Sequence, residues 1–143
     1  ASETGCWPET IHPISKKGAT GEGHYARTNA EFINLIRNML IKETSKELCL
    51  LPHIPKSWLS TDPICVQNAP TQFGHLSFKL FQKKPDNFKL ILSTNFHTKP
   101  KRFEIQFPLQ VKSMTENSKT THIQHQPIPI HPTSKEIEFS LLK

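Results

Sequence analysis

This sequence of 143 residues lacks the features of a membrane-spanning helix and of a secretion signal. No stretch approaches the roughly 20 apolar residues that a membrane helix needs, so we expect no membrane partner. The opening residues, ASETGCWPE, lack the basic start and the apolar segment of a signal peptide, and none is expected there. That absence carries little weight if the chain is a piece of a longer protein.

Cysteine is scarce. Only Cys6, Cys49 and Cys65 occur, and an odd, widely spaced set gives poor support for a disulfide framework. Cys49 and Cys65 lie in apolar surroundings (LCLL and ICV), where we expect them to be small buried hydrophobic residues. The pattern favours a reducing compartment, such as the cytoplasm.

Signatures of metal and cofactor chemistry are also missing. His122, His125 and His131 lie close together, but there is no HExxH and no Cys or carboxylate set at zinc spacing. A histidine cluster on a surface loop is therefore favoured over a metal site. The stretch GATGEG lacks the Gly-Lys-Ser/Thr ending of a phosphate loop and follows no strand. We expect no metal or other cofactor, and no Cys–His nucleophile.

The net charge is +6, and the excess lies in the second half of the chain. Residues 1–74 hold 7 basic and 7 acidic residues, whereas residues 75–143 hold 11 and 5. A basic half can indicate nucleic-acid binding. Here the lysines are scattered among strand-like segments and turns, without an RNP motif or zinc-finger spacing. A solvated face is favoured, and nucleic-acid binding through phosphate neutralisation stays as the weaker alternative.

The first third of the chain predicts a polar loop and one helix. Four of the five glycines fall in residues 1–27, where they permit tight turns. A helix is predicted over 29–43, with Thr28 and Glu31 forming a capping box at its start. Its apolar residues recur at helical spacing and form a broad stripe that must be buried against another element: Phe32, Ile33, Leu35, Ile36, Met39 and Leu40.

From Leu48 onward the hydrophobic period changes to two, which predicts short antiparallel strands of a sandwich. The predicted strands are ELCLL, ICVQN, HLSFKLF, FKLILST, RFEIQFPLQV and KEIEFSLL, with turns at KKPDN, FHTKPK and MTENSK. HIPKSWLS is predicted as a turn anchored by Trp58. QPIPIHPTS, with three prolines, is predicted as an extended edge or loop.

This order resembles the C-terminal part of six-hairpin glycosidases, the (α/α)6-barrel glycoside hydrolases of the glucoamylase-like superfamily. The residues that carry the resemblance are Leu50, Leu51, Pro52, Pro55 and Trp58, then Phe73, Gly74, Ser77 and Phe78. The resemblance covers nearly the whole chain as the tail of such an enzyme. It implies an α+β fold, in which residues 1–46 end the catalytic barrel and residues 47–143 form a C-terminal antiparallel β-sandwich.

The opening stretch WPETIHP…GATGEGHYARTNAEF resembles the loop before the last barrel helices, where a Pro-Glu pair can supply the catalytic base. Only Pro8 and Glu9 match that pair, so the resemblance implies Glu9 as the base. Most of the barrel, the partner carboxylate and the sugar subsites are absent from this sequence. The stretch THIQHQPIPIHP matches no pattern of the family.

Glycoside hydrolysis uses two carboxyl groups, one as acid and one as base or nucleophile. Glu9 is a candidate for one of them, or else a solvated loop residue. Trp7 is either a sugar-stacking platform or a packing anchor, and His12 is a further candidate for the cleft lining. Glu22 can line a cleft or serve as a turn residue, which is favoured. His24 and Tyr25 can bind sugar hydroxyls, although capping a helix or filling a loop is favoured.

The function expected from these features is hydrolysis of a glycosidic bond by the parent enzyme, with a carbohydrate substrate. This chain by itself is not expected to catalyse, because a lone carboxylate loop gives no preorganised site. The rest of a helical barrel is its expected partner. The isolated chain is expected either to dock the helix on its own sandwich or to self-associate through the helix stripe. A stand-alone carbohydrate-binding or adaptor module and a basic nucleic-acid-binding domain are the competing hypotheses.

Overall fold

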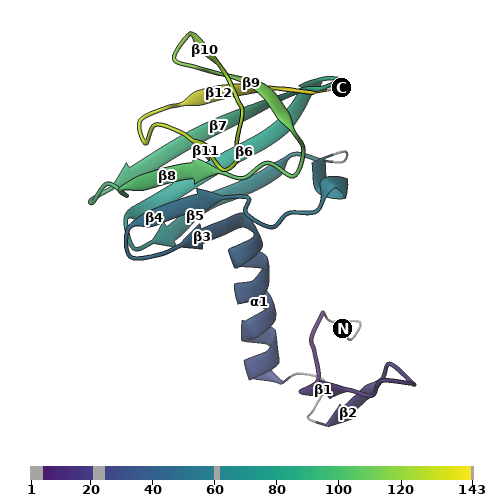
Figure 1. The fold of residues 1–143 in the computed structure, drawn as a ribbon. Helices are drawn as coiled ribbons and strands as arrows, with labels where there is room; N and C mark the ends of the chain where they lie inside the picture. Colours follow the sequence, from purple (N-terminus) through teal and green to yellow (C-terminus); the bar gives the residue numbers. More distant parts are fainter. Residues whose placement is uncertain (1–4, 21–24, 60–61, 143) are drawn as a thin grey trace. The chain divides into compact units, whose positions relative to one another are not determined.

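The computed structural model describes residues 5–20, 25–59 and 62–142. The chain divides into two compact units, Ala1–Asn38 and Met39–Lys143. Most of the described residues in regular structure belong to β-strands, and one α-helix accompanies them within the same residues (Figure 1). The coarse α+β expectation is therefore confirmed.

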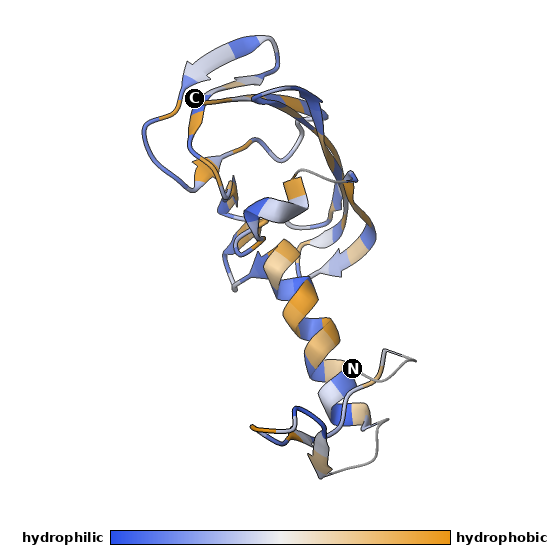
Figure 2. Ribbon diagram, turned by 90° about the vertical axis from the view of Figure 1, so that its right-hand side faces the viewer, coloured by the Kyte–Doolittle hydropathy of each residue, from blue (hydrophilic) through white to orange (hydrophobic). Residues whose placement is uncertain are grey.

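The first unit holds a small hairpin and a helix. Strands β1 (Thr10–Ile11) and β2 (Gly18–Thr20) pair antiparallel, and α1 spans Ala26–Leu40, so its last two residues belong to the second unit. No residue of α1 is buried, and Phe32, Ile33 and Leu35 are 40%, 67% and 56% exposed. Figure 2 shows the apolar residues of α1 alternating with polar ones along the helix. Within the described residues, no helix combines the length and the apolar content needed to span a membrane.

The predicted helix boundaries, 29–43, are wrong at both ends. The amide of Asn29 donates to the carbonyl of Tyr25 at 3.1 Å, so the first turn begins before Thr28 and the predicted capping box does not form. At the other end, Ile41–Glu43 forms strand β3, in which Ile41 pairs with Leu50. Sheet pairing of these residues, and burial of Ile41, take the place of a further helical turn.

The larger sheet of the second unit has six strands in the order β10-β9-β12-β7-β6-β5. Their bounds are β5 Ile64–Thr71, β6 Gly74–Lys84, β7 Asn87–Phe96, β9 Val111–Glu116, β10 Lys119–His122 and β12 Glu136–Leu141. Every pairing in this sheet is antiparallel, as predicted. The predicted alternation also holds: Leu76, Phe78 and Leu80 are buried while the residues between them face outward.

The smaller sheet has four strands in the order β11-β8-β4-β3, namely β3, β4 (Glu47–Leu50), β8 (Arg102–Ile105) and β11 (Ile128–Pro129). A short 3-10 helix, η1 (Lys56–Leu59), follows β4 in the chain. The expectation of purely antiparallel pairing is wrong here, because β4 and β8 run parallel. QPIPIHPTS supplies only the edge strand β11, as expected of a proline-rich segment.

The stretch RFEIQFPLQV was predicted as one strand and instead contributes to both sheets. It supplies β8 at its start and the first residue of β9 at its end. Between them, the amide of Phe107 donates to Oε1 of Gln126 at 2.7 Å, and Pro108 has no amide hydrogen to donate to a ladder. The chain therefore leaves one sheet and enters the other at this point.

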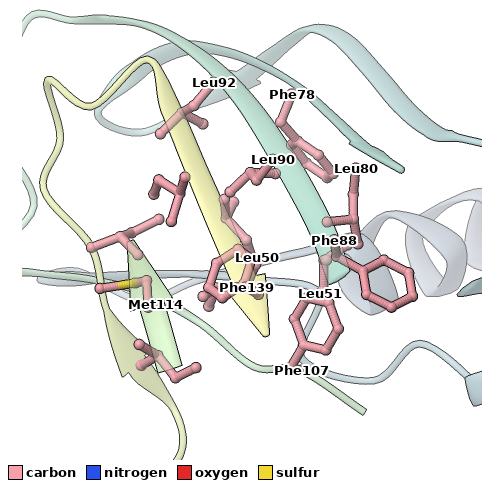
Figure 3. Close-up of a cluster of buried hydrophobic side chains, with 14 of the residues drawn as sticks. Leu50, Leu51, Phe78, Leu80, Phe88, Leu90, Leu92, Phe107, Met114 and Phe139 are labelled. Carbon is pink, nitrogen blue, oxygen red and sulfur yellow. The ribbon is translucent and has the colours of Figure 1, made fainter. Parts of the chain in front are cut away.

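The two sheets enclose one hydrophobic core, which makes this unit β-sandwich-like (Figure 3). Phe107 is 2% exposed, and its ring lies 5.4 Å from that of Phe88 and 5.2 Å from that of Phe139. The rings of Phe96 in β7 and Phe103 in β8 meet edge to face at 5.8 Å, which joins the sheets directly. Such aromatic pairs contribute beyond the area that they bury.

Polar contacts fix the loop before the last strand. Oε1 of Glu116 accepts hydrogen bonds from the amide of His131 at 2.8 Å and from Oγ of Ser134 at 2.5 Å. Ser134 is the buried polar residue of the described chain, at 3% exposure. Oγ1 of Thr94 donates to the carbonyl of Pro132 at 2.7 Å. One carboxylate thus satisfies two donors and holds this loop beside the sheet.

Replacing Phe107 by alanine is expected to lower the free energy of unfolding by about 3–5 kcal/mol, because it leaves a cavity between Phe88 and Phe139. The measurement is urea-induced unfolding followed by circular dichroism. Ile91→Ala is the control, since Ile91 is 40% exposed and should cost less than about 1 kcal/mol. Equal losses in the two variants would contradict the placement of Phe107 in the core.

Candidate functional site

Trp7 is fixed to α1 by its backbone and by its ring. Its amide donates to Oδ1 of Asn29 at 2.8 Å, and its carbonyl accepts from the amide of Tyr25 at 3.2 Å. Its ring packs against that of Phe32 at a centroid distance of 5.3 Å and a tilt of 39°. These contacts hold the loop against the first turns of α1. They also show that Trp7 serves as a packing anchor, whereas sugar stacking on its ring stays a prediction.

The Pro8–Glu9 pair lies between this anchor and the hairpin. The amide of Glu9 donates to the carbonyl of Thr20 at 3.1 Å, so the backbone of Glu9 continues the β1–β2 ladder. A Cβ atom at Gly18 would lie 3.1 Å from Cβ of Pro8, so a glycine there lets the proline pack closely. Glu9 itself is exposed. The arrangement presents one carboxylate to solvent from a fixed backbone, which is compatible with a general base awaiting a substrate.

His12 organises the turn of the hairpin. Its Nδ1 accepts from the amides of Ile14 at 3.3 Å and Ser15 at 3.2 Å, and its amide donates to the carbonyl of Lys17 at 2.8 Å. A neutral ring with Nδ1 as acceptor carries its proton on Nε2. The contacts account for His12 structurally, and its predicted part in a cleft stays a prediction.

Of the remaining predicted cleft residues, Glu22, His24 and Tyr25, the structure describes only Tyr25. Glu22 and His24 lie outside the described residues. Tyr25 is half-buried, and its carbonyl accepts the first hydrogen bond of α1, so its backbone caps the helix. The described residues of the first unit hold one further carboxylate, Glu31, which is exposed on α1. Of the predicted site residues, Trp7 and Tyr25 are joined by a backbone hydrogen bond, and Glu9 follows Trp7 by two residues and is bonded to Thr20 of the hairpin.

Sequence reasoning missed Asn29, whose side chain ties Trp7 to the helix. An asparagine in a first helical turn is common, and no spacing rule links it to a residue so far upstream. The indole nitrogen of Trp7 is a second unforeseen feature. Nε1 is buried and has no hydrogen-bond partner within the described part of the chain. A buried N–H without an acceptor is costly, so this atom marks where an acceptor would stabilise the loop.

The histidine cluster shows no metal-site geometry. Nδ1 of His131 lies 2.8 Å from Oγ1 of Thr133, while His122 and His125 are exposed. The searched residues, which are those that the structure describes, contain no group of three His, Cys, Asp or Glu side chains suited to a metal. Of the three histidines, His131 makes side-chain contacts within its own loop.

The expectation of two buried cysteines in the second unit is wrong for Cys65, which is exposed. Cys49 is half-buried on the outer face of the four-stranded sheet, in a hollow of about 250 Å³ that Lys42, His53 and Glu104 also line. The parallel register places Cys49 directly beside Glu104. Burial, with the Glu104 carboxylate adding to it, raises the pKa of the Cys49 thiol to about 11. Burial likewise raises the pKa of Glu104, against the opposing effect of Arg102.

Because the pKa of Cys49 is raised, its thiol should stay protonated and react slowly at neutral pH. We expect iodoacetamide at pH 7 to modify exposed Cys65 at least about a hundredfold faster than Cys49. The rate at Cys49 should rise about tenfold per pH unit up to a pH of about 11. Peptide mapping by mass spectrometry measures both rates, and Cys49→Ser should remove only the slow reaction. Equally fast modification at pH 7 would contradict the prediction.

Known proteins give no guide to this site. No protein family, no curated protein and no solved structure matches this chain. A functional proposal therefore depends on the contacts around Trp7 and Glu9, on the exposed face of α1 and on the sequence motifs.

Proposed function

We propose that this chain is the C-terminal part of a six-hairpin (α/α)6-barrel glycoside hydrolase. In this proposal the loop, the hairpin and α1 end the catalytic barrel, and the sandwich-like unit follows it. Glu9 is the catalytic base. Trp7, His12, Glu22, His24 and Tyr25 line the cleft, which a carbohydrate substrate occupies once the rest of the barrel is present.

The exposed apolar stripe of α1 carries the proposal. The 15-residue helix has an apolar face and no buried residue, so the contacts seen among the described residues leave most of that face uncovered. Ile33 and Leu35 are more than half exposed, and Ile36 and Met39 are half-buried. The stripe is wider than the two-position seam of a coiled coil. A width of this kind suits a helix packed between neighbouring helices, as in a barrel wall.

The fixed loop before α1 supports the same proposal. Trp7 is bonded to Asn29 and Tyr25 and packs on Phe32, so Glu9, two residues later, has a defined backbone position. A catalytic carboxylate needs such positioning by its neighbours. The buried Nε1 of Trp7 adds a place for an acceptor from the missing barrel.

The competing hypotheses have less support. A sugar-binding face built from the sheet phenylalanines is disfavoured, because the six buried ones lie in the core: Phe73, Phe78, Phe88, Phe103, Phe107 and Phe139. A nucleic-acid face is disfavoured by ion pairing. Lys83 lies 2.7 Å from Glu138, and Lys89 lies 2.8 Å from Glu136, so carboxylates already neutralise part of the basic half.

The isolated chain is expected to self-associate through α1. Replacing Ile33 and Leu35 together by aspartate should weaken this association at least about tenfold, because it puts charge on the apolar stripe. Sedimentation velocity over a concentration series measures the effect. The matched control is Asn34→Asp with Asn38→Asp, two exposed positions of the same helix. If the unsubstituted 143-residue chain is monomeric at all concentrations, the proposal loses its main physical support.

The proposal itself is tested on the native polypeptide. An antibody against residues 64–143 should detect a band several times larger than the 16.4 kDa of this chain in a lysate of the source organism. In that full-length protein, Glu9→Gln should lower glycoside hydrolysis at least about a hundredfold, as expected for loss of a general base. Glu31→Gln, an exposed carboxylate on α1, is the control and should keep full activity.

Two results would overturn the proposal. A native band near 16.4 kDa would show that no barrel accompanies this chain. Full activity of the Glu9→Gln enzyme would remove Glu9 from the base role, even if the large polypeptide exists.

A further inference from the structure

The second unit has a groove that the predicted site does not include. It has a volume of about 280 Å³ and lies where η1 leads toward β5 and where β6 passes beside β7. Trp58 of η1, Asp62, Ile64 of β5, and Phe81 and Gln82 of β6 line it. Its volume lies just below the range of about 300–1,000 Å³ that is typical of small-molecule sites, and it combines an apolar lining with a few polar groups, as such sites do.

Trp58 gives the groove a fixed aromatic surface. It is half-buried and packs against the hydrophobic core, next to Leu59, which is 8% exposed. Its amide donates to the carbonyl of Pro55 at 3.1 Å, so the 3-10 turn holds its backbone. An indole held in this way offers a flat apolar surface and an N–H donor at little further loss of conformational entropy.

Two polar side chains beside Trp58 are available for a ligand. Asp62 and Gln82 are both exposed, and neither side chain has a hydrogen-bond or ion-pair partner among the residues described. A carboxylate accepts hydrogen bonds only, whereas an amide both donates and accepts. Together with the indole, they can satisfy several hydroxyl groups at the rim of one small ligand.

The chemistry of the groove selects a neutral polyhydroxy ring. A hexopyranose has an apolar C–H face that packs on an indole, and a rim of hydroxyls that bind carboxylate and amide groups. An anionic ligand is disfavoured, because Asp62 lines the groove and the nearby Lys79 ammonium is engaged over the Phe81 ring at 5.8 Å. We propose that the groove at Trp58, Asp62 and Gln82 binds a hexopyranose unit of an oligosaccharide.

This site would be an accessory one, distant in sequence from Glu9 and built wholly within the second unit. Its purpose rests on the proposed glycosidase function, since a sugar site on the sandwich would hold a polymeric substrate beside the catalytic barrel. Binding at the groove, however, needs neither Glu9 nor the barrel. If the groove binds no sugar, the glycosidase proposal still stands. If the chain is not part of a glycosidase, the groove can still bind a sugar, but the purpose given for that binding is lost.

The experiment titrates the 143-residue chain with maltoheptaose, cellohexaose or laminarihexaose and follows the two tryptophan indole N–H signals by NMR. Trp7→Phe and Trp58→Phe assign the two signals. We expect at least one saccharide to shift the Trp58 signal saturably below about 10 mM, while the Trp7 signal stays in place. Sorbitol at the same hydroxyl concentration is the ligand control and should shift neither signal.

Variants then test the residues named in the groove. Asp62→Asn and Gln82→Ala, both at exposed positions, should weaken binding at least about threefold, whereas Gln67→Ala on β5 should leave it unchanged. Trp58→Ala should abolish saturation transfer from protein to saccharide, and Trp7→Phe should preserve it.

Four outcomes would overturn the proposal. One is the absence of a saturable shift at Trp58 with all three saccharides. Another is equal movement of both indole signals. The third is a shift with a proline-rich decapeptide but with none of the saccharides, which would assign the groove to peptide binding. Unchanged binding in both Asp62→Asn and Gln82→Ala would also contradict the polar contacts that define the site.

Discussion

The parallel pairing of β4 with β8 is the constraint on which the second unit depends. It sets Leu48 beside Phe103 and Leu50 beside Ile105, and all four side chains are buried. These residues cover the inner face of the six-stranded sheet, which would otherwise present a continuous apolar surface to water. The same register has a consequence on the opposite face, where it sets Cys49 beside Glu104, whose carboxylate adds to the effect of burial in raising the pKa of the thiol. One pairing therefore fixes both the core and the surroundings of Cys49 in the hollow on the outer face.

Local pattern predicted the strands whose two faces differ most. β6, β7 and β12 alternate buried and outward residues, and period-two patterning identifies such strands because water and core impose opposite demands on neighbours. The same pattern failed at Phe107, which is buried in phase with Phe103 and Ile105 although it has left the strand. Alternation reports burial and says nothing of which group receives the backbone hydrogen bond. Here the partner is the side chain of Gln126, and β4 likewise finds its partner across a long stretch of sequence.

The candidate site shows the same limit of sequence reasoning. Glu9 was selected from a family resemblance, and the structure adds the contacts that hold its backbone, which no local pattern indicates. The capping box at Thr28 satisfied a local rule, yet the helix begins earlier because Tyr25 and Asn29 are engaged with each other and with Trp7. A cap contributes about 1 kcal/mol. Several tertiary contacts acting together outweigh it, so the helix start follows the loop that packs on it.

The two tryptophans of the chain illustrate how similar sequence surroundings lead to different roles. Each stands near a proline in a turn-rich segment, and each was a candidate for packing. The ring of Trp7 packs on Phe32, and its buried N–H has no acceptor among the described residues. These contacts hold the loop in place. Trp58 packs on the core, but it still lines a groove beside two polar side chains that have no partners within the described chain. An aromatic ring recognises a ligand only where part of its surface remains available and polar groups lie beside it. By that physical criterion, the groove at Trp58 meets the requirements for recognising a ligand within the second unit, whereas the observed contacts of Trp7 hold the loop that carries Glu9.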